Sequence, residues 1–140
     1  MKILVIDIDD TLILSPSPCR FFWLLAGLFQ KIAMRLQKAN MKLVGLFDKY
    51  DKVVILTGRD IADSEFTNRQ LKQLGIHFDR TIFCPRTNLV GQWKLSVIHE
   101  LAGTDGDDIW WIDDRLDKSI PTDELSSRRF HIVPLEPFLV

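Results

Sequence analysis

The fold is decided by the stretch "ILVIDIDDTL", Ile3 to Leu12, in which branched apolar residues lead directly into three aspartates. The apolar run predicts a β-strand over Lys2–Ile8. Its apolarity is continuous rather than alternating, which is typical of a parallel-sheet strand covered on both faces. Further apolar runs predict four more strands, at Lys52–Leu56, Arg80–Phe83, Ile109–Ile112 and Phe130–Val133.

Helical patterns lie between these strands. They cover Cys19–Lys38, with a continuation through Asn40–Lys49, and then Ala62–Leu74 and Gln92–Leu101. This alternation predicts an α/β fold, a three-layer Rossmann-like arrangement with a mainly parallel sheet of about five strands. The length of 140 residues suits a single domain, 1–140, with residues 19–49 as a short helical insert after the first strand.

Composition excludes several classes of protein. Lys and Arg number 18 against 19 Asp and Glu, so no general charge draws the chain to nucleic acid or anionic membranes, although a local basic patch stays open. Cys19 and Cys84 lack the spacing of a zinc site and fit reduced thiols. With no recognisable signal peptide, and with Phe21–Phe29 too short for a transmembrane segment, we expect a cytoplasmic protein.

Polar residues fall where the predicted strands end. Asp7 stands at the end of the first strand, Thr57 at the end of the second, and Asp113 and Asp114 at the end of the fourth, while Lys94 begins the helix before that fourth strand. Each has an ordinary explanation as a turn or capping residue, but the whole set would converge at the edge where parallel sheets bind ligands. Clustered carboxylates need a counter-charge, and hard oxygen ligands suit Mg²⁺. The pattern therefore predicts a magnesium-assisted reaction on an anion such as a phosphate.

The same residues resemble a known family. "DIDDT" fits the D-x-D-x-T signature of the haloacid dehalogenase-like (HAD) phosphohydrolases. "VVILTGR" with Thr57, then Lys94, then "WWIDDR" with Asp113 and Asp114 match the remaining three motifs in order. "TGR" and "IDDR" are also similar to the 3'-phosphatase domain of bacteriophage polynucleotide kinase.

The resemblance implies a role for each matching residue. Asp7 would be the nucleophile that forms an aspartyl-phosphate, and Asp9 the acid and base for leaving group and water. The Asp7 carboxylate, the Asp9 backbone carbonyl and Asp113 would hold Mg²⁺. Asp10 occupies a position where the family often has glycine, and we expect it to face outward or cap the following turn.

Other residues would serve the phosphoryl group. Thr57 and the Gly58 N–H would hydrogen-bond its oxygens, Lys94 would neutralise it, and Asp114 would position Lys94 or a metal-bound water. Thr11, Arg59 and Arg115 complete the expected substrate-binding set, with surface ion pairing as the alternative for the two arginines.

The site is expected to be open, because the segment between Thr11 and Lys52 is too short for a large α/β cap. A small phosphorylated molecule or a nucleic-acid end would both fit, with no stable nucleic-acid complex expected. The apolar part of the insert could pack on the sheet, form a homodimer through residues 20–38, or touch a membrane surface.

Two alternatives to a phosphatase remain. One is a phospho-acceptor signalling module, although receiver domains have their acidic pair first and their single acceptor Asp later, the reverse of this chain. The other is a non-catalytic binding scaffold, against which stands the presence of every core motif residue.

Overall fold

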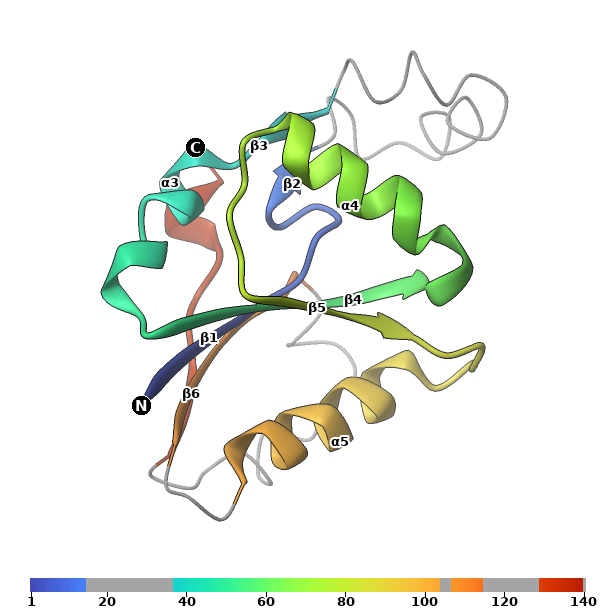
Figure 1. The fold of residues 1–140 in the computed structure, drawn as a ribbon. Helices are drawn as coiled ribbons and strands as arrows, with labels where there is room; N and C mark the ends of the chain where they lie inside the picture. Colours follow the sequence, from blue (N-terminus) through green and yellow to red (C-terminus); the bar gives the residue numbers. More distant parts are fainter. Residues whose placement is uncertain (15–36, 104–106, 115–128, 140) are drawn as a thin grey trace.

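The computed structural model describes residues 1–14, 37–103, 107–114 and 129–139 (Figure 1). A five-stranded sheet has the order β5-β4-β1-β6-β7, and each neighbouring pair is parallel. The strands are β1 (Lys2–Ile6), β4 (Lys52–Asp60), β5 (Arg80–Cys84), β6 (Asp108–Ile112) and β7 (Phe130–Ile132). This sheet and its flanking helices confirm the predicted α/β, Rossmann-like fold.

Helices cover both faces of the sheet. Figure 1 shows α3 (Met41–Val44) and α4 (Ser64–Gln73) on one side and α5 (Val90–Ala102) on the other. Leu4 and Ile6 of β1 enter the core under α4, whereas Ile3 and Val5 enter the core under α5. Alternate side chains of one strand are therefore buried on opposite faces, which is why the first strand is apolar at every position.

The long helices end close to where the sequence predicts. The segment predicted as Ala62–Leu74 begins as the 3-10 helix η2 (Ile61–Asp63) and continues as α4. Gly75 follows with φ of 71°, in the left-handed region that glycine enters without strain. The predicted helix Gln92–Leu101 is α5, one turn of which precedes Lys94.

The insert differs from its prediction at its end. Lys38–Ala39 forms β3, which pairs antiparallel with β2 (Ile13–Leu14), so the helix predicted to reach Lys38 is wrong there. Residues 19–36 of that prediction, with the apolar run proposed as a dimer or membrane surface, lie outside the described residues.

The second helix predicted in the insert is also wrong as a single helix. Asn40–Lys49 contains the short helix α3 and the separate 3-10 helix η1 (Phe47–Lys49), with Gly45 between them. Asn40 caps α3, and its side-chain amide donates to the Thr11 carbonyl at 3.2 Å. Local capping by Asn40 and the break at Gly45 outweigh the helical pattern.

Two strands, β1 and β4, end at other residues than the sequence predicts, next to the motif residues. β1 stops at Ile6 rather than Ile8, because Ile13 N–H bonds the Ile8 carbonyl at 2.9 Å and closes a turn. β4 continues past Leu56 to Asp60, with an irregular register against β5 after Thr57. These departures place the motif residues in a turn and in an irregular strand end.

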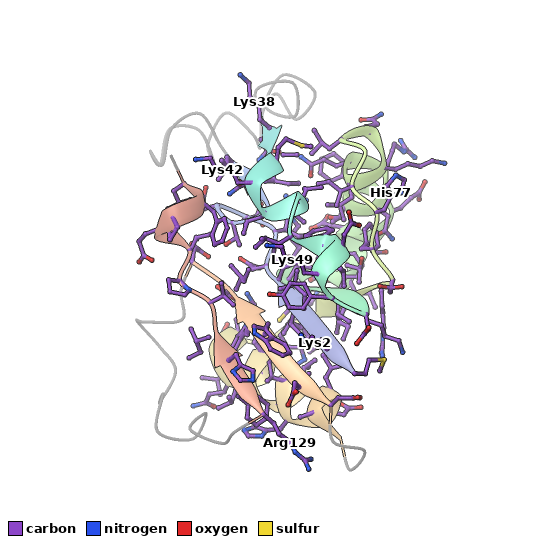
Figure 2. The ribbon with its side chains drawn as sticks, turned by 90° about the vertical axis from the view of Figure 1, so that its left-hand side faces the viewer. Lys2, Lys38, Lys42, Lys49, His77 and Arg129 are labelled. Atoms are coloured by element: carbon purple, nitrogen blue, oxygen red, sulfur yellow. The ribbon has the colours of Figure 1, made fainter. Side chains whose placement is uncertain are left out.

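Basic side chains are spread down one face of the molecule. Figure 2 shows Lys38, Lys42, Lys49, Lys2 and Arg129 along it. Lys2 begins β1, and Arg129 directly precedes β7, so these two cations lie at the amino ends of the strands, opposite the edge where the motif residues lie. Among the described helices, none is long and apolar enough to cross a bilayer.

Candidate active site

The motif residues meet at the topological switch point of the sheet. β1 lies in the sheet between β4, the next long strand along the chain, and β6. Asp7 follows β1 and Asp113 follows β6, so both stand at the carboxyl ends of neighbouring strands. In open α/β sheets, ligands bind at this place. A cleft of about 440 Å³ opens here, lined by Asp7, Asp9, Asp10, Gly58, Arg59, Val90, Lys94 and Asp114.

Lys94 joins two buried carboxylates. Its Nζ lies 3.0 Å from Asp7 Oδ1 and 2.6 Å from Asp113 Oδ2. All three residues are less than a tenth exposed. α5 supplies the lysine from its second turn, so packing of this helix on the sheet brings the ammonium between the ends of β1 and β6.

Burial shapes the charge of this group. It raises the pKa of Asp7 from 3.8 to about 8; Lys94 opposes that rise, and Asp113 adds to it. For Lys94, burial alone would lower the pKa, but the two carboxylates outweigh it and raise the pKa above its ordinary value. The two carboxylates therefore favour the protonated lysine, and further positive charge beside Asp7 would favour its ionised form.

Three carboxylates can supply a metal site. One oxygen each from Asp7, Asp113 and Asp114 lies within 4.8 Å of the others. Such a set of hard oxygen donors, with an open side toward the cleft, fits Mg²⁺ better than a thiolate- or imidazole-preferring ion. The Asp9 side chain is not in this group, and the predicted contact through its backbone carbonyl stays a prediction.

Arg59 holds Asp9, and both residues line the cleft. Arg59 Nη2 lies 2.7 Å from Asp9 Oδ1 and Nε 3.0 Å from Oδ2. The remaining nitrogen, Nη1, donates to Thr67 Oγ1 at 3.2 Å and Gln70 Oε1 at 2.9 Å, both on α4. The guanidinium is thus fixed on two sides, and one of them carries the predicted acid–base residue.

The end of β4 contributes Gly58 and Arg59 to the lining of the cleft and buries Thr57. Thr57 is fully buried, and its Oγ1 accepts the Arg59 backbone N–H at 3.1 Å. A Cβ on Gly58 would come 3.2 Å from Val90 Cγ1, so a side chain there would press on α5 and narrow the cleft. Glycine leaves room for a ligand beside its backbone N–H.

The cleft contains most of the predicted residues. Asp7, Asp9, Gly58, Arg59, Lys94 and Asp114 line it. Asp113 lies behind Lys94, and Thr57 is buried beneath. Thr11 is fully buried and not part of the lining; its Oγ1 has no hydrogen-bond partner within the described ranges. Arg115 lies outside the described residues.

Sequence reasoning missed four residues. Asp10 lines the cleft rather than facing outward, and its φ of 58° lies in the left-handed region, where glycine is least strained. Val90 forms part of the wall. Thr67 and Gln70 of α4 accept hydrogen bonds from Arg59. Two polar residues on the buried face of a helix were the signal in the sequence that could have identified them.

Comparisons with known proteins establish the fold and no more. No known family's sequence profile matches the chain, and no curated protein matches it. A chain in the "Structure of Pnkp1/Rnl/Hen1 complex" is similar, with a TM-score of 0.64 and 19% identity over 94% of this chain. A chain in the "Structure of the Pnkp1/Rnl/Hen1 RNA repair complex" has a TM-score of 0.66 and 18% identity over 94%. This chain spans only 45% and 41% of the lengths of those two chains.

Proposed function

We propose that the protein is a Mg²⁺-dependent phosphatase of the HAD type that hydrolyses a phosphate monoester through an aspartyl-phosphate intermediate. The observation that carries the proposal is the buried group in which Lys94 binds both Asp7 and Asp113 beside a cleft. A purely structural ion pair needs no third carboxylate facing open space, whereas phosphoryl transfer needs a nucleophile, a cation and room for the phosphoryl group.

The residues divide the reaction into two steps. An Asp7 oxygen attacks phosphorus, the bond from phosphorus to the leaving oxygen breaks, and Asp9 gives that oxygen a proton. Asp9 then takes a proton from water as the water oxygen attacks phosphorus, which breaks the bond to Asp7 and releases phosphate. Lys94 and the backbone N–H of Gly58 stabilise charge on the phosphoryl oxygens.

Asp7, Asp113 and Asp114 would hold Mg²⁺. When bound, Mg²⁺ would supply positive charge that favours the ionised form of Asp7 and neutralises the phosphoryl oxygens. The acidic cluster fits this role because Lys94 contributes one positive charge to a group of three carboxylates.

A nucleic-acid end is the substrate class that we favour. The cleft of about 440 Å³ leaves space beyond a phosphoryl group for a sugar or base. The similar fold in the Pnkp1/Rnl/Hen1 RNA repair complex supports an end-processing role by analogy.

A phosphatase screen tests the proposal. Purified protein with Mg²⁺ is offered 3'- and 5'-phosphorylated oligonucleotides, nucleotides, sugar phosphates and phosphopeptides, and released phosphate is measured. We expect turnover with phosphorylated oligonucleotide ends and none after chelation. No turnover across the panel would refute the phosphatase. A slowly hydrolysed acyl phosphate on Asp7 would instead identify a phospho-acceptor module.

A further inference from the structure

The buried face of α4 carries two polar side chains where a helix on a sheet usually carries apolar ones. Thr67 is 0% exposed and Gln70 is 2% exposed, next to the apolar Leu71. A buried polar group is destabilising unless it has a hydrogen-bond partner, so each of these two side chains needs one.

The partner of both side chains is the same atom. Nη1 of Arg59 donates to Thr67 Oγ1 at 3.2 Å and to Gln70 Oε1 at 2.9 Å. The Gln70 amide nitrogen in turn donates to the side-chain oxygen of Gln37, just before β3. The bond to Gln37 orients the Gln70 amide. Because the amide nitrogen donates to Gln37, the amide oxygen is the end that faces Arg59.

The other edge of the guanidinium is occupied by Asp9. Nε and Nη2 of Arg59 each donate a hydrogen bond to one oxygen of that carboxylate. For Asp9 to reach a leaving oxygen, at least one of these contacts must open. A phosphoryl group in the cleft can compete for the same edge, since guanidinium binds carboxylate and phosphate with the same two-point geometry.

We infer that Thr67 and Gln70 are positioning residues that anchor Nη1 of Arg59 while its Nε–Nη2 edge passes from Asp9 to the phosphoryl group of a bound substrate. This inference rests on the proposed phosphatase function. The anchor restricts Arg59 to a small movement at the cleft wall and keeps Asp9 close to the leaving oxygen. Without it, a long flexible side chain would have to be ordered in every turnover.

Leaving-group dependence provides the kinetic test. Gln70→Leu and Thr67→Val remove the two acceptors with little change of size, whereas Thr67→Ser keeps an acceptor. Arg69→Gln, at an exposed position of the same helix, is the control for a general effect on α4.

We expect Gln70→Leu and Thr67→Val to lower kcat/KM, which reports the first step with its loss of the leaving group, about tenfold for alkyl or nucleotide phosphates, a part of the roughly 100- to 10,000-fold that acid catalysis supplies. For 2,4-dinitrophenyl phosphate, whose leaving group needs no proton, we expect a fall of less than about threefold. Thr67→Ser and Arg69→Gln should behave like the wild type. An equal loss for both substrate classes would show a merely structural role and overturn the inference, as would no loss in either acceptor-removing variant.

A measurement that does not depend on turnover separates this inference from the proposed function. The measured quantity is the rate at which the Arg59 guanidinium rotates about its Cζ–Nε bond, and NMR of the Nε–Hε group in the folded protein reports it. This rotation should be slow in the wild type and faster in Gln70→Leu. Slow rotation together with no phosphatase activity would overturn the proposed function alone. Active enzyme with rotation unchanged by Gln70→Leu would overturn the anchor alone.

Discussion

Arg59 binds both carboxylate oxygens of Asp9, with Nη2 2.7 Å from Oδ1 and Nε 3.0 Å from Oδ2. This contact joins the end of β4 to the turn after β1 across the mouth of the cleft. Both side chains are partly buried, at 15% and 26% exposure, so the pair is screened less than a surface ion pair. The geometry requires a planar group with several donors and not only a positive charge.

Arg59→Lys should therefore be a damaging substitution. Lysine keeps the charge but cannot bind both oxygens of Asp9 and also reach Thr67 and Gln70. We expect kcat/KM for the best substrate to fall about 10- to 100-fold, corresponding to a loss of about 1.4–2.7 kcal/mol in transition-state stabilisation. Steady-state kinetics check this, with Lys72→Arg on the exposed side of α4 as a charge-conserving control. Full activity in Arg59→Lys would show that only the charge at this position matters.

Asp7→Asn should abolish turnover without unfolding the protein. The amide keeps the size of the side chain but is a far weaker nucleophile toward phosphorus, and loss of a nucleophile costs about 10⁴-fold or more in kcat. Phosphate release and circular dichroism measure the two effects. Asp48→Asn, in an exposed part of η1, is the matched control. Substantial residual turnover in Asp7→Asn would refute the nucleophile assignment.

The stability of the metal-free protein should fall as the pH rises from about 4 to about 8. Burial raises the pKa of Asp7 from 3.8 to about 8, so between these values the folded state binds a proton that the unfolded state has lost. Unfolding then releases a proton, and a higher pH favours the unfolded state. Asp7→Asn removes this titration, so its melting temperature should depend less on pH and exceed that of the wild type at pH 8.

Thermal melts in a chelator, at several pH values and constant ionic strength, measure this slope. Asp60 should change the stability in the opposite direction. The Ala62 backbone N–H and Arg86 lower its pKa, so its contribution to the folding stability is lost as the pH falls. If Asp7→Asn and the wild type show the same slope from pH 4 to 8, Asp7 does not carry the raised pKa in the folded protein.

The sequence predicted the sheet and the gathering of acidic residues at its edge more reliably than the parts around them. A strand buried on both faces is apolar at each position, and parallel strands place the residues that follow them at one edge, so Asp7 and Asp113 followed from the pattern alone. The Arg59–Asp9 pair joins residues 50 positions apart, and nothing in local periodicity shows which carboxylate an arginine will meet. Helix propensity likewise misled at Asn40, where capping and pairing of β3 with β2 decide the structure.

Mg²⁺ should stabilise the protein through Asp113. Binding to the folded state alone raises stability by about 1.4 kcal/mol for each tenfold excess of metal over its dissociation constant, which is about 3–5 °C for a chain of this size. Asp113→Asn removes one of the three clustered carboxylates and one partner of Lys94, so most of this metal-dependent rise should disappear. Melting temperatures are compared with and without Mg²⁺ for the wild type, Asp113→Asn and Asp107→Asn, a control before the other end of β6. Equal stabilisation of all three proteins by Mg²⁺ would place the metal elsewhere, whereas loss in Asp113→Asn alone would assign it to this cluster.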